Sequence, residues 1–570
     1  MYTTSAAFLE ALQEAGVSHI FANFGSDHPA LIESLAEMRA TGRAALKVIT
    51  CPNEMVALSA AHGFAQVTGQ AQAVFVHVEC GTQALAGAIH NAAKGRVPVL
   101  IFAGASPFTQ EGELRGSRNE FIHWIQDVRD QRGIVRGYMK YDNEIRTGAN
   151  VKQLVFRAMQ IAHSDPQGPV YLMGPREVME QEAPAARVDP AEWPPLAPGA
   201  IPTADIANLV DDLLAAHRPL VVTSYLGRNP EAVAELVRLA ERVGMAVLES
   251  VPNYVNFPTD HYLHQGSQGN ETFQNPVLDQ ADVILVMDSD VPWIPMISKP
   301  AASAKIYHID VDPLKEQMPL WYIHAKRAFR ADAATTLRQM SAYLEQVTPE
   351  QNAVEARTAH YSTLHEERSK GLKKREQPLD DTITPEYLTA SVRRHLDADT
   401  IVLNEGITNY TAIADHLGAT RPGSVLTSGG GSLGWNGGAA IGVKLANPTK
   451  TVACLTGDGS YMFSVPSSVH WIARRYSTPF LQIIYNNGGW RAPKLSMLAV
   501  HPEGYGSQAS DIDVSFDPPA NYGGIAAAAG GAFAREVLCC GELDTALAEA
   551  FRVVRQEGRC AVLDVRLPHL

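Results

Sequence analysis

The sequence predicts an α/β protein made of three doubly wound parallel-sheet domains. Short apolar runs, too short to be helices, alternate with helix-like stretches along the whole chain. These runs fall into three groups, which are separated by two segments without apolar periodicity. In the last group the runs end in glycine or asparagine, as expected where parallel strands lead into ligand-binding loops.

The first group covers residues 1–182. Its first 16 residues, MYTTSAAFLEALQEAG, are predicted to form an amphipathic helix. Strands are predicted within residues 17–25, 71–78, 98–104 and 168–175. Residues 183–202 are rich in proline and interrupt every periodicity, so we expect a surface linker there.

The second group covers residues 203–345 and the third covers residues 383–570. Polar and charged residues dominate 346–382, where we expect a second linker. The third group opens with Thr384 followed by Pro385, which predicts an N-cap and the first turn of a helix. Strands are predicted within residues 218–227, 245–250, 281–290, 304–313, 400–406, 423–431, 451–459, 479–487 and 560–568.

Composition limits the partners. The 570 residues carry a net charge of -14, which offers no basic surface to nucleic acid, so a small metabolite is the better expectation. The six cysteines form no C-x-x-C pair. No apolar run approaches the roughly 18 residues that span a bilayer. We therefore expect a soluble cytoplasmic protein with no membrane partner.

The most specific motif is Gly457-Asp458-Gly459-Ser460, which closes one predicted strand. Asn486-Asn487 closes the next, with Asn487 lying 29 residues after Asp458. Mg²⁺ prefers oxygen ligands and commonly shares one or two carboxylates with phosphate oxygens, and the glycines let backbone N–H groups approach a phosphate. As a bare tripeptide, Gly-Asp-Gly is equally expected in a plain strand-to-helix turn.

With this motif the sequence resembles the thiamine diphosphate-dependent enzymes that include acetohydroxyacid synthase, benzoylformate decarboxylase and benzaldehyde lyase. The resemblance covers nearly the whole chain. It implies a pyrimidine-binding domain, a central domain and a diphosphate- and Mg²⁺-binding domain, in that order. It also implies thiamine diphosphate and Mg²⁺ as cofactors, and a homodimer or homotetramer with active sites between subunits.

The resemblance assigns cofactor contacts to particular residues. Asn53-Glu54 opens a segment that matches the family's HE-x-x-A pattern up to Thr68-Gly69, so Glu54 is expected to touch the aminopyrimidine. The alternative for Glu54 is an exposed carboxylate at a helix start. The segment 430–442 resembles the loop that bends the cofactor, with Leu433 as the wedge and the Gly431 carbonyl as acceptor. The remaining expected ligands are Asn409 for the cofactor and Gly489 for the metal.

Three acid–base candidates come from the same comparison. His28 aligns with an active-site histidine of benzaldehyde lyase, although the chain is shorter just before it, so Ser26 or Asp27 is an alternative. His77 aligns with a histidine of benzoylformate decarboxylase, and imidazole titrates near neutrality. Gln126 resembles a glutamine near the bound intermediate. For either histidine the alternative is a hydrogen-bonded structural residue.

These features predict a lyase or transferase, a decarboxylase or carboligase of the acetolactate synthase-like group. The expected substrate is a 2-keto acid, a 2-hydroxy ketone or an aldehyde. Pro493 stands where the pyruvate decarboxylase branch has glutamate, which disfavours simple pyruvate decarboxylation. The alternatives are a flavin-linked oxidase of the pyruvate oxidase type and a non-catalytic cofactor-binding relative. The central domain has no G-x-G-x-x-G, so FAD is unsupported.

Overall fold

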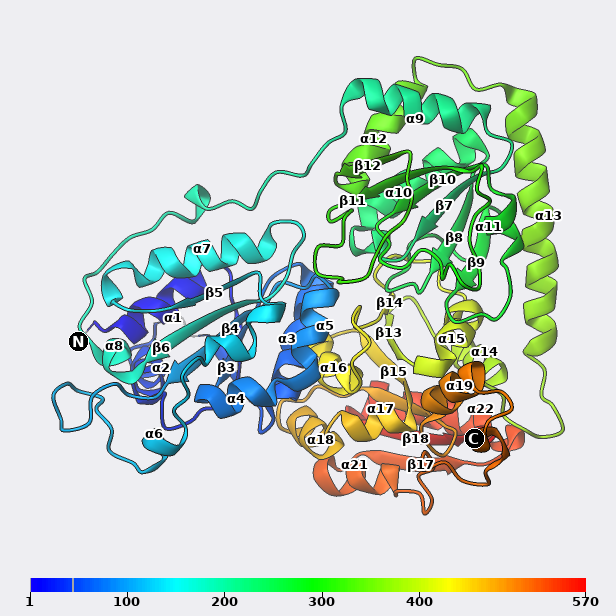
Figure 1. Cartoon of the computed structure of the whole chain (residues 1–570). Coiled ribbons are helices and arrows are strands. Elements are labelled where there is room, and N and C mark those ends of the chain that lie inside the picture. The colour runs from blue at the N-terminus through cyan, green and yellow to red at the C-terminus, as the bar shows by residue number, and fades with distance from the viewer. Residues whose placement is uncertain (1, 44–45, 570) are drawn as a thin grey trace.

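In the computed structural model, which describes residues 2–43 and 46–569, the chain forms three α/β units, each built on a six-stranded sheet (Figure 1). Neighbouring strands of the described sheets pair in parallel, for example β1 with β3, β10 with β7 and β15 with β16. Helices cover both faces of each sheet. The predicted fold class is confirmed.

The first unit contains the N-terminal part of the chain, blue to cyan in Figure 1. Its sheet has the order β2 (Lys47–Thr50), β1 (His19–Ala22), β3 (Ala73–Val76), β4 (Leu100–Ala105), β6 (Val170–Pro175) and β5 (Tyr141–Glu144). Its helices are α1 (Thr4–Glu14), α2 (Pro29–Ala40), α3 (Glu54–Thr68), α4 (Val78–Ala84), α5 (Ala86–Lys94), α6 (Ile122–Ile125), α7 (Val151–His163) and α8 (Arg176–Glu180).

The second unit has a different strand order. Its sheet runs β12 (Arg327–Arg330), β11 (Lys305–Asp310), β10 (Val283–Met287), β7 (Pro219–Thr223), β8 (Ala246–Ser250) and β9 (His264–Gln268). The strand order reverses between β7 and β10, which in open parallel sheets marks the ligand-binding crevice. Its helices are α9 (Thr203–Ala215), α10 (Pro230–Val243), α11 (Pro276–Gln280), α12 (Ala333–Leu344) and α13 (Gln351–Arg375).

The third unit repeats the strand order of the first. Its sheet runs β14 (Val425–Leu426), β13 (Thr400–Glu405), β15 (Thr451–Gly457), β16 (Leu481–Asn486), β18 (Ala561–Arg566) and β17 (Phe533–Val537). Its helices are α14 (Pro385–His395), α15 (Tyr410–Leu417), α16 (Trp435–Ala446), α17 (Asp458–Phe463), α18 (Pro466–Arg475), α19 (Arg491–Val500), α20 (Tyr505–Gln508), α21 (Tyr522–Gly530) and α22 (Cys540–Arg552). As predicted, Thr384 caps α14 by accepting a hydrogen bond from the Tyr387 N–H.

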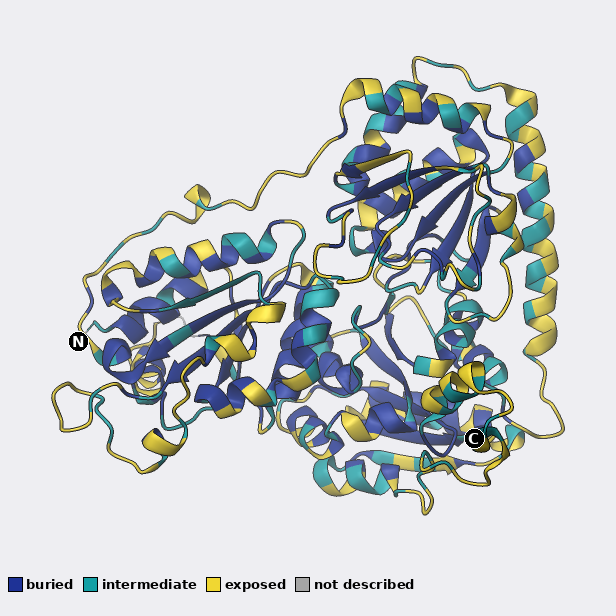
Figure 2. Ribbon diagram, viewed as in Figure 1, coloured by how far each residue is buried: buried dark blue, intermediate teal, exposed yellow. Residues whose placement is uncertain are grey.

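The connections between units differ from each other. Between α8 and α9 the chain is extended apart from a short turn at Pro190–Glu192. The expected linker 346–382 is instead mostly the 25-residue helix α13, which lies along the outside of the second unit (Figures 1 and 2). Only Arg357 and Tyr361 of α13 are buried, so its sequence lacks the apolar stripe that marks most surface helices.

The first and third units pack together through α3 and α16. Glycines allow the two backbones to approach closely, because a Cβ at Gly442 would lie 1.8 Å from the Ala60 oxygen, and one at Gly63 would lie 2.4 Å from the Ala439 oxygen. The start of α3 and the loop before α16 are therefore fixed relative to each other. No helix among the described residues is long and apolar enough to cross a membrane.

Candidate active site

Asp458 lies at the carboxyl end of β15, at the start of α17. Its carboxylate accepts hydrogen bonds from the N–H groups of Gly459 and Gly488, both at 2.9 Å. Burial raises the pKa of Asp458 to about 6, although these backbone donors act in the opposite direction. Within the described residues no cationic side chain pairs with this buried carboxylate. Such a group is suited to a bound metal ion.

The end of the neighbouring strand β16 faces Asp458. Asn487 is buried, and its side-chain oxygen lies 3.3 Å from the Gly489 N–H. Gly488 and Gly489 have φ values of 82° and 152°, a region that favours glycine and lets the backbone turn next to Asp458. No group of three or more His, Cys, Asp or Glu that could hold a metal by itself occurs in the described part of the chain. A cation here would share these few protein oxygens with a phosphate.

The same edge of the third sheet carries the other expected cofactor contacts. Gly457 has open space in front of it, since a Cβ there would meet nothing within 4 Å. Gly459 and Ser460 are buried in the first turn of α17. Asn409 is buried at the end of a short 3₁₀ turn after β13, and Ile407 in that turn has a positive φ of 53°. Strained backbone of this kind clusters at functional sites.

The glycine loop, residues 429–434, connects β14 to α16. Gly431 has a φ of 89° with open space beside its Cα, and Leu433 is half-buried. Glu405 fixes the end of the loop, because its carboxylate accepts from the N–H groups of Gly434 at 2.6 Å and Asn436 at 2.8 Å. Burial raises the pKa of Glu405 to about 7, against the effect of its N–H donors.

Helix α5 of the first unit holds the glycine loop from the other side. Asn91 is 1% exposed, donates to the Ser432 carbonyl at 2.8 Å and accepts from the Ser432 N–H at 2.9 Å. The His90 Nε2 lies 2.9 Å from the Gly430 carbonyl oxygen. His90 therefore contacts the loop that is expected to bend the cofactor.

Glu54 lies at the corresponding edge of the first sheet, where it opens α3. Asn53 caps this helix by accepting from the Val56 N–H at 3.1 Å. Glu54 is 8% exposed, and its carboxylate accepts a hydrogen bond from the Asn23 amide at 2.9 Å. Glu54 is thus oriented by a neighbour and not freely exposed, contrary to the alternative of a solvated helix-start residue.

His77 and Gln126 lie at the same edge as Glu54. The His77 Nε2 is 2.7 Å from the Gln126 Oε1, and the His77 Nδ1 is 2.6 Å from the Asp27 Oδ1. The side chain of His77 is 20% exposed, whereas that of Asp27 is 1% exposed. The structure therefore brings together His77, Gln126 and Asp27, which was one of the two alternatives to His28.

His28 is buried behind this edge, where its Nδ1 lies 3.0 Å from the Asp27 Oδ1 that also contacts His77. It is 1% exposed, and its ring is within 6.0 Å of the Phe102 ring centre and 5.6 Å of the Phe24 ring centre. Its Nε2 is buried without a hydrogen-bond partner among the described residues. Of the three alternatives at this position, Asp27 contacts His77, while the Ser26 hydroxyl lies 3.3 Å from the His123 Nε2.

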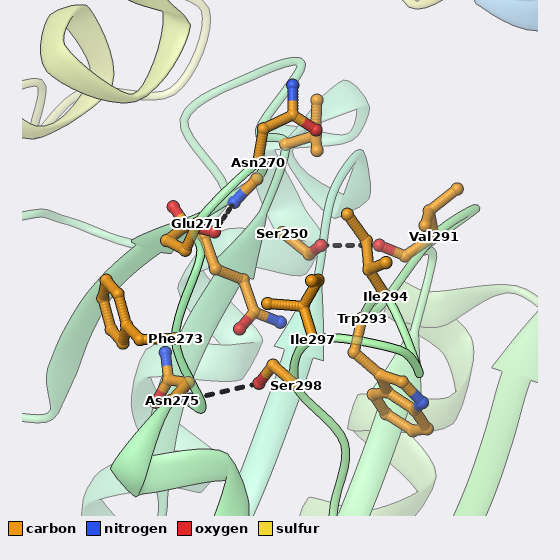
Figure 3. Close-up of a pocket in the computed structure, with 13 residues that line it drawn as sticks. Ser250, Asn270, Glu271, Phe273, Asn275, Val291, Trp293, Ile294, Ile297 and Ser298 are labelled. Carbon is orange, nitrogen blue, oxygen red and sulfur yellow. Dashed lines mark hydrogen bonds between the residues drawn. The ribbon is translucent and has the colours of Figure 1, made fainter. Parts of the chain in front are cut away.

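The second and third units share a cavity that no sequence motif predicted. It has a volume of about 440 Å³ and lies over the glycine loop. A second cavity of about 210 Å³, shown in Figure 3, adjoins it and is lined by both apolar and polar side chains of the second unit. Both cavities contact the loop 268–271, which includes Asn270 and Glu271. No motif in the sequence indicated that this loop reaches the third unit.

The crevice between β7 and β10 holds an ionic network made by side chains of the second unit and by Arg96 of the first. Lys315 is fully buried and pairs with Asp310 at 2.7 Å and Asp290 at 2.8 Å. Tyr225 donates to Asp310 at 2.6 Å, and Arg96 of the first unit pairs with Asp290 at 2.7 Å. The position where a dinucleotide would enter is thus occupied by a buried ionic network, which gives no support to a flavin at this crevice.

Comparison with known proteins agrees with this architecture. Three protein-family models match the chain: the N-terminal TPP binding domain of thiamine pyrophosphate enzymes over residues 2–134, their central domain over 206–340 and their C-terminal TPP binding domain over 406–565. Together they cover well over half of the chain. The order of the three domains is the one that the sequence predicted.

Relatives with curated names are similar over most of their length. Benzoylformate decarboxylase of Pseudomonas aeruginosa is 26% identical over 502 residues, 86% of this chain and 87% of the relative. The acetolactate synthase isozyme 3 large subunit of Escherichia coli is 25% identical, over 76% of this chain and 74% of the relative.

Solved structures share the fold. The thiamine diphosphate-dependent 4-hydroxybenzoylformate decarboxylase of Rhodococcus jostii RHA1 superimposes with a TM-score of 0.78 at 21% identity, covering 100% of this chain and 99% of that one. Benzoylformate decarboxylase of Polynucleobacter necessarius gives 0.79 at 18% identity and covers both chains fully.

The chain therefore belongs to the thiamine pyrophosphate enzyme family, and it is a thiamine diphosphate-dependent decarboxylase or carboligase. Thiamine pyrophosphate and thiamine diphosphate are two names for the same cofactor. The relatives are decarboxylases and synthases, and they lend no support to the flavin-linked oxidase.

Proposed function

We propose that the enzyme acts on a 2-keto acid, a 2-hydroxy ketone or an aldehyde, with thiamine diphosphate held by Mg²⁺. The observation that carries the proposal is the buried, unpaired carboxylate of Asp458 beside Asn487 at the edge of the third sheet. Asp458, Asn487 and the Gly489 carbonyl would hold Mg²⁺, which prefers such oxygen ligands. The diphosphate would lie against Asn409, Gly457, Gly459 and Ser460.

The aminopyrimidine would contact Glu54, the Gly431 carbonyl and Leu433. When bound, thiamine diphosphate supplies a nucleophilic carbon and an electron sink for bonds next to a carbonyl group. Glu54, oriented by Asn23, would share a proton with the pyrimidine ring. The glycine loop would fix the bend of the cofactor, and Glu405 and Asn91 keep that loop in place.

We propose further that two copies of the chain complete each site. Within the described residues, no hydrogen bond or ion pair joins the Glu54 and His77 edge to the Asp458 and Asn487 edge. Large apolar side chains beside Gln126 are exposed, including Phe121 at 80% and Ile125 at 75%. Exposed apolar surface of this kind favours a subunit interface. A homodimer or homotetramer would cover it and bring the two edges together.

The cytoplasmic location stays a prediction. All six cysteines are unpaired, which supports a reducing compartment.

The cofactor assignment is tested by calorimetric titration of the metal-free protein with thiamine diphosphate, with and without Mg²⁺. We expect binding that depends on Mg²⁺ and is lost in Asp458→Ala. The matched control is Asp544→Ala, which removes an exposed carboxylate of the same unit. Equal binding by the Asp458→Ala variant would refute the metal site. A panel of 2-keto acids and aldehydes then identifies the substrate.

A further inference from the structure

Asp27 and His77 form a carboxylate–imidazole pair at the edge of the first sheet. The His77 Nδ1 lies 2.6 Å from the Asp27 Oδ1, and the Val78 N–H donates to the Asp27 Oδ2 at 3.0 Å. The Asp27 side chain is 1% exposed, so both of its oxygens make their hydrogen bonds inside the protein. A hydrogen bond to an ionised acceptor is about twice as strong as one between neutral groups.

The surrounding chain leaves room for this pair and for nothing larger. A Cβ at Gly25 would lie 2.0 Å from the His77 Nδ1, and a Cβ at Gly104 would lie 2.0 Å from the Asp27 Oδ2. Val78 has a positive φ of 32°, an unusual value for a β-branched residue, and this conformation aims its N–H at Asp27. Two glycines and one strained residue thus make space for the same contact.

The second ring nitrogen of His77 also faces an oxygen. Its Nε2 is 2.7 Å from the Gln126 Oε1, and the amide nitrogen of Gln126 lies 3.2 Å from the Cys80 sulfur. With the Gln126 amide in this orientation, oxygens face both ring nitrogens, and only the protonated imidazolium has an N–H donor for each. This arrangement favours the cationic form of His77.

The charged and titratable groups around His77 come from several elements. Asp27 and His28 lie on the loop after β1, Glu54 opens α3, and Cys80 lies on α4. Burial alone would lower the pKa of His77, but the hydrogen bond and negative charge of Asp27 raise it overall, with Glu54 adding to the effect. Burial acts to raise the pKa of Asp27, yet His28 and His77 hold it below its usual range.

We propose that Asp27 is a positioning residue that holds His77 as an imidazolium, with its Nε2–H available at the edge where the substrate binds. This inference rests on the proposed function. The substrate carbonyl oxygen replaces the Gln126 Oε1 as the acceptor of the Nε2–H, and His77 delivers this proton to it as that oxygen gains negative charge. The N–H bond breaks, an O–H bond forms, and the electron pair stays on Nε2. Asp27 remains ionised, and solvent reprotonates the ring through its 20% exposed side.

The charge state of His77 is measured directly by NMR titration of ¹⁵N-histidine-labelled protein without cofactor. The His77 signal is assigned from its absence in His77→Gln. An unperturbed imidazole is half protonated at about pH 6.5. We expect His77 to be more than half protonated at that pH in the wild type, with a lower pKa in Asp27→Asn. The matched control Asp130→Asn changes an exposed aspartate of the same unit and should leave the titration unchanged.

The kinetic consequence is measured on the holoenzyme. We expect Asp27→Asn to lower kcat by about 10²-fold or more, the contribution of a positioned general acid. The pH at which activity falls on the alkaline side should also move to a lower value, while the affinity for thiamine diphosphate stays unchanged. A purely structural role for Asp27 would lower stability without moving this pH profile.

Three outcomes would overturn the inference. A neutral His77 at pH 6.5 in the wild type would do so even if Asp27→Asn fails to fold. So would an unchanged His77 titration in a folded Asp27→Asn, or an unchanged pH profile in that variant. Failure of the wild type to bind thiamine diphosphate would instead refute the proposed function, and the cofactor-free titration keeps the two failures distinct.

Discussion

Replacing Asn91 by alanine tests whether helix α5 holds the glycine loop in the shape that binds the cofactor. The buried Asn91 side chain makes two hydrogen bonds to the Ser432 backbone, at 2.8 and 2.9 Å. Each is worth about 1 kcal/mol net, so losing both costs about 2 kcal/mol. If that cost falls on the bound form of the loop, the Kd for thiamine diphosphate rises about 30-fold.

The assay is calorimetric titration with thiamine diphosphate at saturating Mg²⁺. Asn91→Asp keeps the acceptor for the Ser432 N–H but loses the donor to its carbonyl, so we expect an intermediate Kd. The matched control is Asn143→Ala, which removes an asparagine that donates to the Tyr141 hydroxyl at 2.7 Å on the far edge of the sheet. A folded Asn91→Ala variant that binds as tightly as the control would refute the reasoning.

Further predictions concern stability. Lys315→Met should lower the stability of the second unit by about 3–5 kcal/mol, because it leaves the buried Asp310 without its lysine partner, while Asp290 keeps Arg96. Hydrogen exchange of the β10 and β11 amides measures this, and Lys305→Met, at an exposed lysine, should change exchange by at most about 1 kcal/mol. Gly442→Ala should separate α3 from α16 and lower the melting temperature, since its Cβ would lie 1.8 Å from a backbone oxygen; an unchanged melting temperature would contradict this. The pKa of Asp27 is lowered in the folded state. The wild type should therefore be more stable than Asp27→Asn above about pH 4, and this difference should shrink as the pH falls below that value. A constant difference in the free energy of unfolding by urea from pH 3 to 7 would argue against the pairing.

The interior strands of each sheet could be predicted from the sequence, but most of the edge strands could not. Strands such as β4 and β10 are fully buried, and their continuous apolar runs identified them. The edge strands β2 (KVIT), β5 (YDNE), β9 (HQGSQ), β12 (RAFR) and β17 (FAREV) were missed, whereas the edge strand β14 lies within the predicted range 423–431. Edge strands are short and partly polar, so no apolar run distinguishes them from loops. Helix α13 was missed because it buries only two of its residues.

The candidate site shows the same limit. The metal and diphosphate residues could be predicted because they form a short local motif at strand ends, made of glycines, Asp458 and Asn487. The pairing of Asp27 with His77 joins residues 50 positions apart, and the choice among Ser26, Asp27 and His28 depends on which way a short loop turns. The contact of Asn91 with Ser432 spans 341 positions. Such contacts depend on how the units pack, which no local spacing encodes.

The end of α5 and the turn after it attach the first unit to both others within a few residues. Asn91 binds the glycine loop, Lys94 donates to the Gln317 carbonyl at 2.9 Å, and Arg96 pairs with Asp290. Each added residue in a helix rotates everything beyond it by about 100°. A single insertion or deletion between Asn91 and Arg96 would therefore break the contact with either the second or the third unit, because both contacts could not form at once. The length of this turn is fixed by geometry, so among homologous chains it should tolerate changes of residue far better than changes of length.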